Sequence, residues 1–203
     1  MSSIMIVDYG MANLRSVQKA LEKVGFGAKI SSDPNEIGEA DKVILPGVGA
    51  FRDAIACIRE TKLAEPIRTH IQKGTPFLGI CLGLQMLFTR SHEDGIYPGL
   101  DVFPGEVIRF TERPGLKIPH MGWNTLRFRK PCPLFEGLSD GDAVYFVHSY
   151  FAAPEENDLT IAEADYPLPF TAAIWQDNVF ATQFHPEKSQ GVGLRMLKNF
   201  AKM

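Results

Sequence analysis

The sequence predicts an α/β fold: a mixed, mostly parallel central sheet flanked by helices, with added antiparallel strands in the C-terminal half. In the first half, short apolar runs alternate with amphipathic stretches, which is the pattern of βαβ units around a parallel sheet. In the second half, short strand-like runs follow one another between Pro, Gly, Asp and Asn residues. The 203 residues, 45% hydrophobic and 22% charged, suit one globular domain spanning 1–203.

The strands and helices of the first half can be placed one by one. Ile4–Val7 is entirely apolar, so we expect a short strand buried on both faces. Between Leu14 and Val24 apolar residues recur every three or four positions, which predicts a helix that Gly25 ends. The other elements expected here are strands at 28–30, 42–45 and 77–80, one or two helices over 54–72, and the start of a helix at 82–88.

The second half consists mainly of expected strands. They lie at 107–110, 124–128, 143–147, 160–164, 170–175 and 179–184, and a helix over about 191–201 closes the chain. Asp177-Asn178 separates two of these runs and is a plausible hairpin turn. We expect these strands to extend the main sheet or to form a second one.

Composition excludes several classes of protein. The formal net charge of −3 gives no electrostatic reason to expect nucleic acid as a partner. No apolar run approaches the roughly 18 residues of a membrane span, and the N-terminus lacks a secretory pattern. Cys57, Cys81 and Cys132 are odd in number and widely spaced, which predicts neither a zinc site nor a disulfide framework. We therefore expect a cytoplasmic protein with no metal, no cofactor and no membrane partner.

Cys81 is the strongest candidate for chemistry. It stands in Gly79-Ile80-Cys81-Leu82-Gly83, which follows an apolar strand and precedes an expected helix. This is the context of a nucleophile elbow, with cysteine in place of serine. A helix N-terminus favours a thiolate, and the backbone N–H of Leu82 is placed to bind an oxyanion.

A nucleophilic thiol needs a base, and His185 has the best context among the five histidines. It follows an apolar strand, and Pro186 favours an extended conformation at His185. Residues i and i+2 of an extended segment point to the same side, so Glu187 can orient the His185 ring. By contrast, His70 lies between polar residues of an expected helix, and we expect it to be solvated.

The loop Pro46-Gly47-Val48-Gly49 follows the third strand. Its glycines allow backbone N–H groups to turn towards a ligand. No Gly-Lys-Ser/Thr follows and no GxGxxG is present, so the pattern does not predict a nucleotide site. Beside Cys81, the loop suits the second half of an oxyanion hole.

Together these motifs resemble the class I (triad) glutamine amidotransferases, almost from end to end of the chain. The shared family pattern is a central cysteine elbow and a late His-x-Glu, matched here by Cys81, His185 and Glu187. The blocks that carry the resemblance are Asp8-Tyr9-Gly10 with Asn13, and residues 46–51, 79–85, 119–124, 148–150 and 183–189. Ala12 departs from the glycine expected before the asparagine, but it lies in a loop outside the triad.

The resemblance implies glutamine hydrolysis through a thioester. Cys81 would attack the glutamine side-chain amide, His185 would transfer protons, and Glu187 would orient the imidazole. The oxyanion would be held by backbone of Leu82 and of the loop, and glutamine by three further residues. The loop residues are Gly47, Val48 and Gly49, and the glutamine-binding residues are Gln85, Ser149 and Tyr150.

Within the family, the match is closest to glutaminase subunits that supply a separate (β/α)8-barrel cyclase of histidine biosynthesis. Ammonia that escaped into water would be lost, so such a subunit must dock on its consumer. The candidate interface residues are Asn13, Met121, Trp123 and Lys188. The alternatives are a glutaminase subunit of another synthase (pyridoxal phosphate or anthranilate), a stand-alone cysteine hydrolase, and a non-catalytic subunit.

Overall fold

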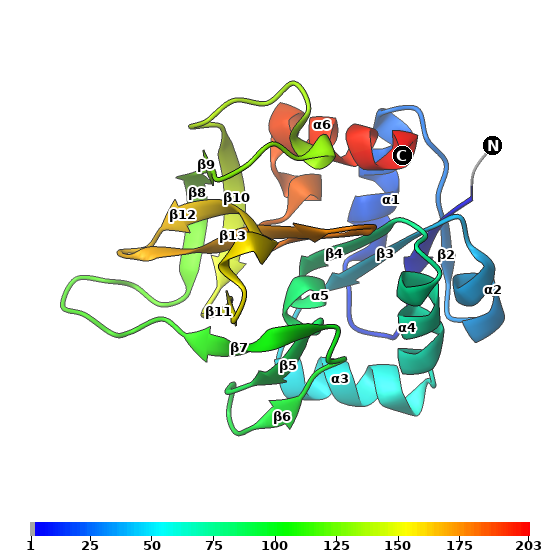
Figure 1. The fold of residues 1–203 in the computed structure, drawn as a ribbon, viewed down its shortest axis with the longest axis horizontal. Helices are drawn as coiled ribbons and strands as arrows, with labels where there is room; N and C mark the ends of the chain where they lie inside the picture. Colours follow the sequence, from blue (N-terminus) through cyan, green and yellow to red (C-terminus); the bar gives the residue numbers. More distant parts are fainter. Residues whose placement is uncertain (1–2) are drawn as a thin grey trace.

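A computed structural model describes residues 3–203, and an eight-stranded sheet crosses it (Figure 1). The strand order is β2-β1-β3-β4-β14-β13-β12-β9. The first five strands pair in parallel and the remaining pairs are antiparallel. The bounds are β1 Ile4–Val7, β2 Lys29–Ser31, β3 Lys42–Gly47, β4 Phe77–Cys81, β9 Arg127–Phe128, β12 Thr160–Asp165, β13 Pro169–Gln176 and β14 Val179–Thr182. The expected mixed, mostly parallel sheet is confirmed.

Helices cover both faces of the parallel part (Figure 1). Ile4 and Ile6 of β1 face one core, whereas Met5 and Val7 face the other, because successive strand residues point to opposite sides. The first core packs under α1 (Leu14–Lys23) and α6 (Gln190–Lys202). The second packs under α2 (Pro34–Glu39), α3 (Phe51–Glu60) and α4 (Ala64–Gln72). Over residues 3–203, no helix is long and apolar enough to cross a membrane.

The remaining strands form two smaller sheets, so the C-terminal half both extends the main sheet and builds others. A four-stranded sheet has the order β11-β7-β5-β6, and β10 pairs with β8. The bounds are β5 Phe88–Ser91, β6 Tyr97–Pro98, β7 Phe103–Arg109, β8 His120–Thr125, β10 Ala143–His148 and β11 Tyr150–Pro154. Three short 3₁₀ turns complete the chain: η1 Pro133–Phe135, η2 Asn157–Leu159 and η3 Pro186–Lys188.

The helix expected at 82–88 is much shorter than the sequence suggested. α5 spans only Leu82–Gln85, and the chain enters β5 at Phe88. The carbonyl oxygens of Met86 and Leu87, which a longer helix would use, instead accept hydrogen bonds from the backbone N–H groups of Leu100 and Val102. Because these carbonyl groups bond to residues 100 and 102, α5 does not continue for another turn. The six-residue α2 was not expected from the sequence, although Asp33 caps it through the Asn35 N–H.

The expectation of a solvated His70 is wrong. The side chain is fully buried, and its Nε2 lies 3.1 Å from the Pro76 carbonyl oxygen. His70 follows Ile67 by three positions, so both lie on the buried face of α4. Polar neighbours in the sequence were misleading because they occupy the other face of the helix.

A substitution at Gly193 in α6 tests how closely this helix packs on η3, the segment that follows His185. A Cβ at Gly193 would stand 1.9 Å from the Pro186 carbonyl oxygen, which is backbone and cannot rotate away. We expect Gly193→Ala to lower the free energy of unfolding by about 1–3 kcal/mol, as overpacking commonly does. Denaturant unfolding measures this change.

Gly191→Ala is the matched control, because a Cβ at Gly191 meets nothing within 4 Å in the same helix. Alanine favours helices over glycine, so this variant is expected to keep or slightly raise stability. Equal stability of the two variants would contradict the close packing of α6 on η3.

Candidate active site

The five parallel strands end at one edge of the sheet, and Cys81 is the last residue of β4, which lies between β3 and β14. In the strand register Gly47 of β3 stands opposite Cys81, and Thr182 of β14 stands opposite Ile80. The chain therefore leaves β3 on one side of Cys81 and continues to His185 on the other. The site lies at the carboxyl ends of the strands, where open α/β sheets commonly bind ligands.

Cys81 occupies the sharp turn between β4 and α5. Its backbone has φ 55° and ψ −107°, a conformation rare for residues with a side chain. A Cβ at Gly83 would stand 1.9 Å from the Leu45 carbonyl oxygen, and one at Gly79 would stand 2.9 Å from the Gly83 carbonyl oxygen. Gly83 thus lets the turn approach β3, and Gly79 lets the start of α5 fold back over β4.

His185 and Glu187 form a buried pair beside Cys81. Glu187 Oε1 lies 2.8 Å from His185 Nδ1, and both side chains are only 2% exposed. The backbone holds His185 in place, because its N–H donates to the Tyr145 carbonyl and its carbonyl accepts from the Ser189 hydroxyl. His185 Nε2 has no hydrogen-bond partner among residues 3–203, which leaves this nitrogen free for proton exchange with the Cys81 thiol.

The electrostatics of the pair favour a protonated imidazole. Burial by itself lowers the pKa of His185, but the charges of Cys81 and Glu187 outweigh it and raise that pKa to about 10. An imidazolium next to a cysteine sulfur stabilises the thiolate. The arrangement therefore suits proton exchange between Cys81 and His185.

A cavity of about 160 Å³ opens on Cys81 and His185. It brings together most of the residues that the sequence singled out. Its lining comprises Val48, Gly49, Cys81, Leu82, Gln85, Glu93, Val147, His148, Ser149, Tyr150 and His185. Glu187 lies behind the imidazole, and Gly47 lies in β3 against the elbow, where a Cβ would stand 2.8 Å from Leu82 Cβ.

The glycine loop lines the cavity, but one of its N–H groups is engaged elsewhere. The Val48 N–H donates to the Met11 carbonyl oxygen at 3.4 Å, and Gly49 has φ 94°. In this conformation the Val48 N–H is not free to bind an oxyanion.

Two further residues of the site were missed at the level of sequence. Gln183 is fully buried, and its side-chain N–H donates to the Cys81 sulfur at 3.7 Å. Its oxygen accepts from the Gln85 amide, which also donates to the Tyr150 carbonyl. The signal was present, because Gln183 precedes His185 by two residues on the same side of an extended segment.

Glu93 is the second missed residue and the only carboxylate in the lining of the cavity. Its Oε2 accepts the Phe51 N–H at 2.7 Å, which fixes the side chain. Burial raises the pKa of Glu93. No local pattern predicts a place for Glu93 in the site, since it lies in a polar loop between two short strands.

The four candidate interface residues lie outside the cavity, and all four are exposed. Met121 and Trp123 project from β8 with 62% and 50% exposure, which excludes a core role for Trp123. Asn13 directly precedes α1, without a side-chain capping bond, and Lys188 belongs to η3. η3 packs against α1 and β10, and β10 pairs with β8, so these residues lie on neighbouring elements.

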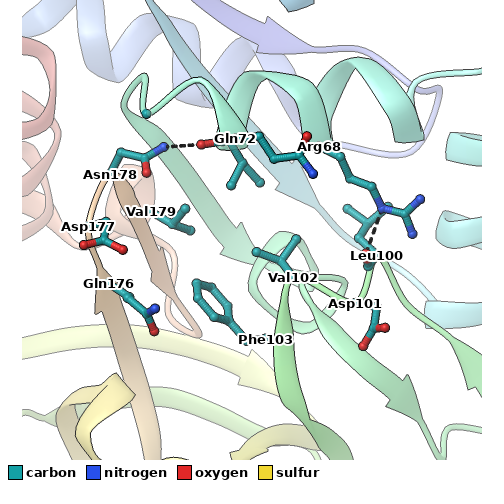
Figure 2. A pocket seen from close by; sticks show the side chains of 12 residues that line it. Arg68, Gln72, Leu100, Asp101, Val102, Phe103, Gln176, Asp177, Asn178 and Val179 are labelled. Carbon is teal, nitrogen blue, oxygen red and sulfur yellow. Dashed lines mark hydrogen bonds between the residues drawn. The ribbon is translucent and has the colours of Figure 1, made fainter.

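A second cavity, of about 400 Å³, lies beside the β13–β14 turn and holds none of the expected site residues (Figure 2). Two of its polar side chains already donate hydrogen bonds to backbone carbonyl oxygens of the protein: Asn178 to Ile71, and Arg68 to Leu100. Across the described chain, no three His, Cys, Asp or Glu side chains gather in a way that could hold a metal ion.

Comparison with known proteins decides the family. The model of the family "Glutamine amidotransferase class-I" matches residues 5–203. The chain belongs to this family. It is a glutamine amidotransferase, as the cysteine elbow and the late His-x-Glu indicated.

Relatives of high identity match this amidotransferase along nearly its whole length. The imidazole glycerol phosphate synthase subunit HisH of Syntrophotalea carbinolica is 55% identical over 98% of this chain and 100% of its own. The HisH subunit of Aquifex aeolicus is 53% identical over 98% of this chain and 95% of its own.

Solved structures agree on the fold of this amidotransferase. A structure described as a glutamine amidotransferase superposes with a TM-score of 0.76 at 20% identity, covering 98% of this chain and 99% of that one. The structure of PurLQS from Thermotoga maritima superposes with a TM-score of 0.77 at 18% identity, covering 100% of this chain and 98% of that one. At these identities the likeness concerns the fold alone.

Removing the Glu187 charge tests the electrostatics of the site. The Glu187 hydrogen bond and charge both raise the pKa of His185. We therefore expect Glu187→Gln to move the titration of His185 to lower pH, and NMR of the ¹⁵N-labelled imidazole measures the shift.

Glu106→Gln is the matched control, since Glu106 forms the same kind of pair with exposed His92 at 2.8 Å. It should leave the titration of His185 unchanged. An unaltered His185 titration in Glu187→Gln would contradict the role assigned to the carboxylate.

Proposed function

We propose that this amidotransferase is the glutaminase subunit of imidazole glycerol phosphate synthase. It would hydrolyse glutamine to glutamate and deliver the ammonia to a cyclase subunit. That subunit would convert the ribulosyl aminoimidazole carboxamide nucleotide (PRFAR) to imidazole glycerol phosphate and AICAR for histidine synthesis. The observation that carries the proposal is the 160 Å³ cavity shared by Cys81 and His185, in a chain whose full-length relatives are HisH subunits.

In the proposed reaction Cys81, His185 and Glu187 act as a triad. The Cys81 sulfur attacks the side-chain amide carbon of glutamine, and the carbon–nitrogen bond breaks as His185 protonates the leaving nitrogen. Water, deprotonated by His185, then hydrolyses the glutamyl thioester to glutamate. The 2.8 Å contact between Glu187 and His185 supports an orienting and stabilising role for the carboxylate.

The cavity suggests how glutamine is held. Glu93 offers the only negative side chain in the lining and suits the α-ammonium group of glutamine. Gln85, Ser149 and Tyr150 lie along the same wall, where backbone and amide groups can bind the remaining polar atoms. The volume of about 160 Å³ suits a small amino acid.

The oxyanion is proposed to bind the N–H groups of Leu82 and of the Gly47–Gly49 loop. Because the Val48 N–H donates to Met11 in this structure, the loop must reorient before it can contribute. Loss of one oxyanion donor costs about 10²–10³ in rate, so an isolated chain in this conformation would be a poor glutaminase. Partner binding is the proposed trigger for the change.

The proposed partner is a (β/α)8-barrel cyclase, which would dock on Asn13, Met121, Trp123 and Lys188. Exposed methionine and tryptophan on one strand suit the centre of a protein interface. Docking there would allow ammonia to pass between subunits without reaching water. We also propose that residues 1–203 form one glutaminase domain and that the enzyme is cytoplasmic, in keeping with its free Cys57, Cys81 and Cys132.

Replacing the nucleophile should separate the two half-reactions. In the complex with the cyclase, Cys81→Ala is expected to reduce glutamine-dependent synthesis to below about a thousandth, while synthesis from added ammonium salt persists. Product formation from the nucleotide under both conditions measures this. Cys57→Ala, which removes a half-buried thiol outside the cavity, should retain both activities. Loss of both activities in an intact Cys81→Ala complex would contradict the division of labour.

Truncating Trp123 should weaken docking without unfolding the subunit. Trp123 is half exposed, so Trp123→Ala is expected to raise the Kd for the cyclase by about tenfold or more, with little change in Tm. Calorimetric titration of the two subunits measures the Kd. Ile96→Ala, at another exposed apolar position in the β5–β6 hairpin, is the control and should bind as the wild type does. An unchanged Kd in Trp123→Ala would contradict the proposed surface.

A further inference from the structure

Two buried histidines connect β8 to the wall of the cavity by a continuous series of hydrogen bonds. The Asn124 side-chain nitrogen lies 3.3 Å from His120 Nε2, and His120 Nδ1 lies 3.1 Å from His148 Nε2. His148 Nδ1 in turn lies 2.8 Å from the Tyr150 carbonyl oxygen. His120 and His148 stand opposite each other in the β8–β10 register, so the two strands fix the contact.

The partners at the two ends fix the direction of every bond. The Tyr150 carbonyl can only accept, so His148 Nδ1 carries a hydrogen. A neutral imidazole has one N–H, so His148 Nε2 accepts from His120 Nδ1, and His120 Nε2 must also accept. The Asn124 side-chain NH₂ supplies that last hydrogen.

The orientation of the Asn124 amide is itself determined by its other contacts. Its Oδ1 accepts the Thr125 N–H at 2.8 Å, and its Nδ2 donates to the Asp165 carbonyl at 3.0 Å. A second proton on either imidazole would place two donors face to face, so the series is satisfied only when both histidines are neutral.

The surroundings agree with neutral rings. His120 is 4% and His148 7% exposed. His120 stacks on Phe146 and Tyr166, and Phe110 and Phe170 pack around both rings. Burial lowers the pKa of His120 to about 4 and that of His148 to about 3.

The series ends on the Tyr150 carbonyl oxygen, in the wall that is proposed to bind glutamine. The Tyr150 carbonyl also accepts from Gln85, whose amide continues through Gln183 to the Cys81 sulfur. Its other end is on β8, where side chains alternate. His120 and Asn124 point to one side, and Met121 and Trp123 project from the other into the proposed partner surface.

We propose that Asn124, His120 and His148 act as positioning residues: a neutral chain of hydrogen bonds that sets the Ser149–Tyr150 backbone and ties it to β8. The proposal rests on the glutaminase function proposed above and adds residues that do not touch the reacting atoms. The hydrogen-bond chain would hold the glutamine-binding wall in place. Disrupting it should therefore change the KM for glutamine more than kcat.

The tautomers give a direct spectroscopic test on the unmodified protein. Long-range ¹H–¹⁵N NMR at pH 7 should find His120 and His148 neutral with the hydrogen on Nδ1. His70 is an internal reference in the same spectrum, because its Nε2 faces the Pro76 carbonyl and should carry the hydrogen. Hydrogen on Nε2 of either His120 or His148, or a charged ring at pH 7, would overturn the proposal.

A matched pair of variants tests the consequence for activity in the complex with the cyclase. Asn and Leu are nearly equal in size, but only the Asn amide nitrogen can replace the Nδ1 donor of His120. We expect His120→Leu to raise the KM for glutamine about tenfold, the value of one lost hydrogen bond, and His120→Asn to stay within about threefold of wild type. His92→Asn, at an exposed position, should behave as wild type.

The outcomes separate this proposal from the glutaminase function. An active wild type with equal KM values in His120→Leu and His120→Asn would overturn the positioning role. Synthesis from ammonium salt should be the same in all variants, which checks that the complex is intact. An inactive wild-type complex would contradict the proposed function instead, and the tautomer spectrum alone would then decide whether the neutral chain exists.

Discussion

The turn at Cys81 is the constraint on which the rest of the site depends. A residue with a side chain at φ 55° costs of order 1–3 kcal/mol, so the surrounding structure must enforce it. Gly83 allows the turn to pack directly on the backbone of β3, and Gly79 allows Gly83 to approach β4 closely. The strained turn projects the sulfur beyond the sheet edge, where the cavity and the His185 ring meet it.

The charges of His185 and Glu187 then determine the electrostatic environment of the Cys81 sulfur. A single helical turn follows Cys81, so the helix dipole is small and the adjacent imidazole is the main stabiliser of a thiolate. Burying either charge alone would be costly, and the 2.8 Å contact between His185 and Glu187 offsets part of that cost. Gln183 adds a neutral donor to the Cys81 sulfur, and its amide links Cys81 through Gln85 to the wall that would hold glutamine.

Several elements of the fold and of the candidate site could be predicted from the sequence, because their signals are local. The strand Ile4–Val7 was predictable because an unbroken apolar run indicates burial on both faces, and the helix after it because its apolar residues recur at helical spacing. The turn at Cys81 and the contact between His185 and Glu187 were predictable because a tight turn and an extended His-Pro-Glu segment have short-range signatures. The early end of α5 and the placement of Glu93 depend on residues far along the chain. The burial of His70 follows instead from the face of α4 that it shares with Ile67. The Asn124–His120–His148 series likewise exists only once β8 pairs with β10.

The central claim is that Cys81 carries a glutamyl thioester. Acid quenching of the complex during turnover of glutamine, followed by peptide mass spectrometry, tests it most directly. The account predicts a glutamyl adduct on the peptide that contains Cys81, absent from those of Cys57 and Cys132 and absent from Cys81→Ala. Steady glutamate production with no adduct on Cys81, or continued production by Cys81→Ala, would contradict the account.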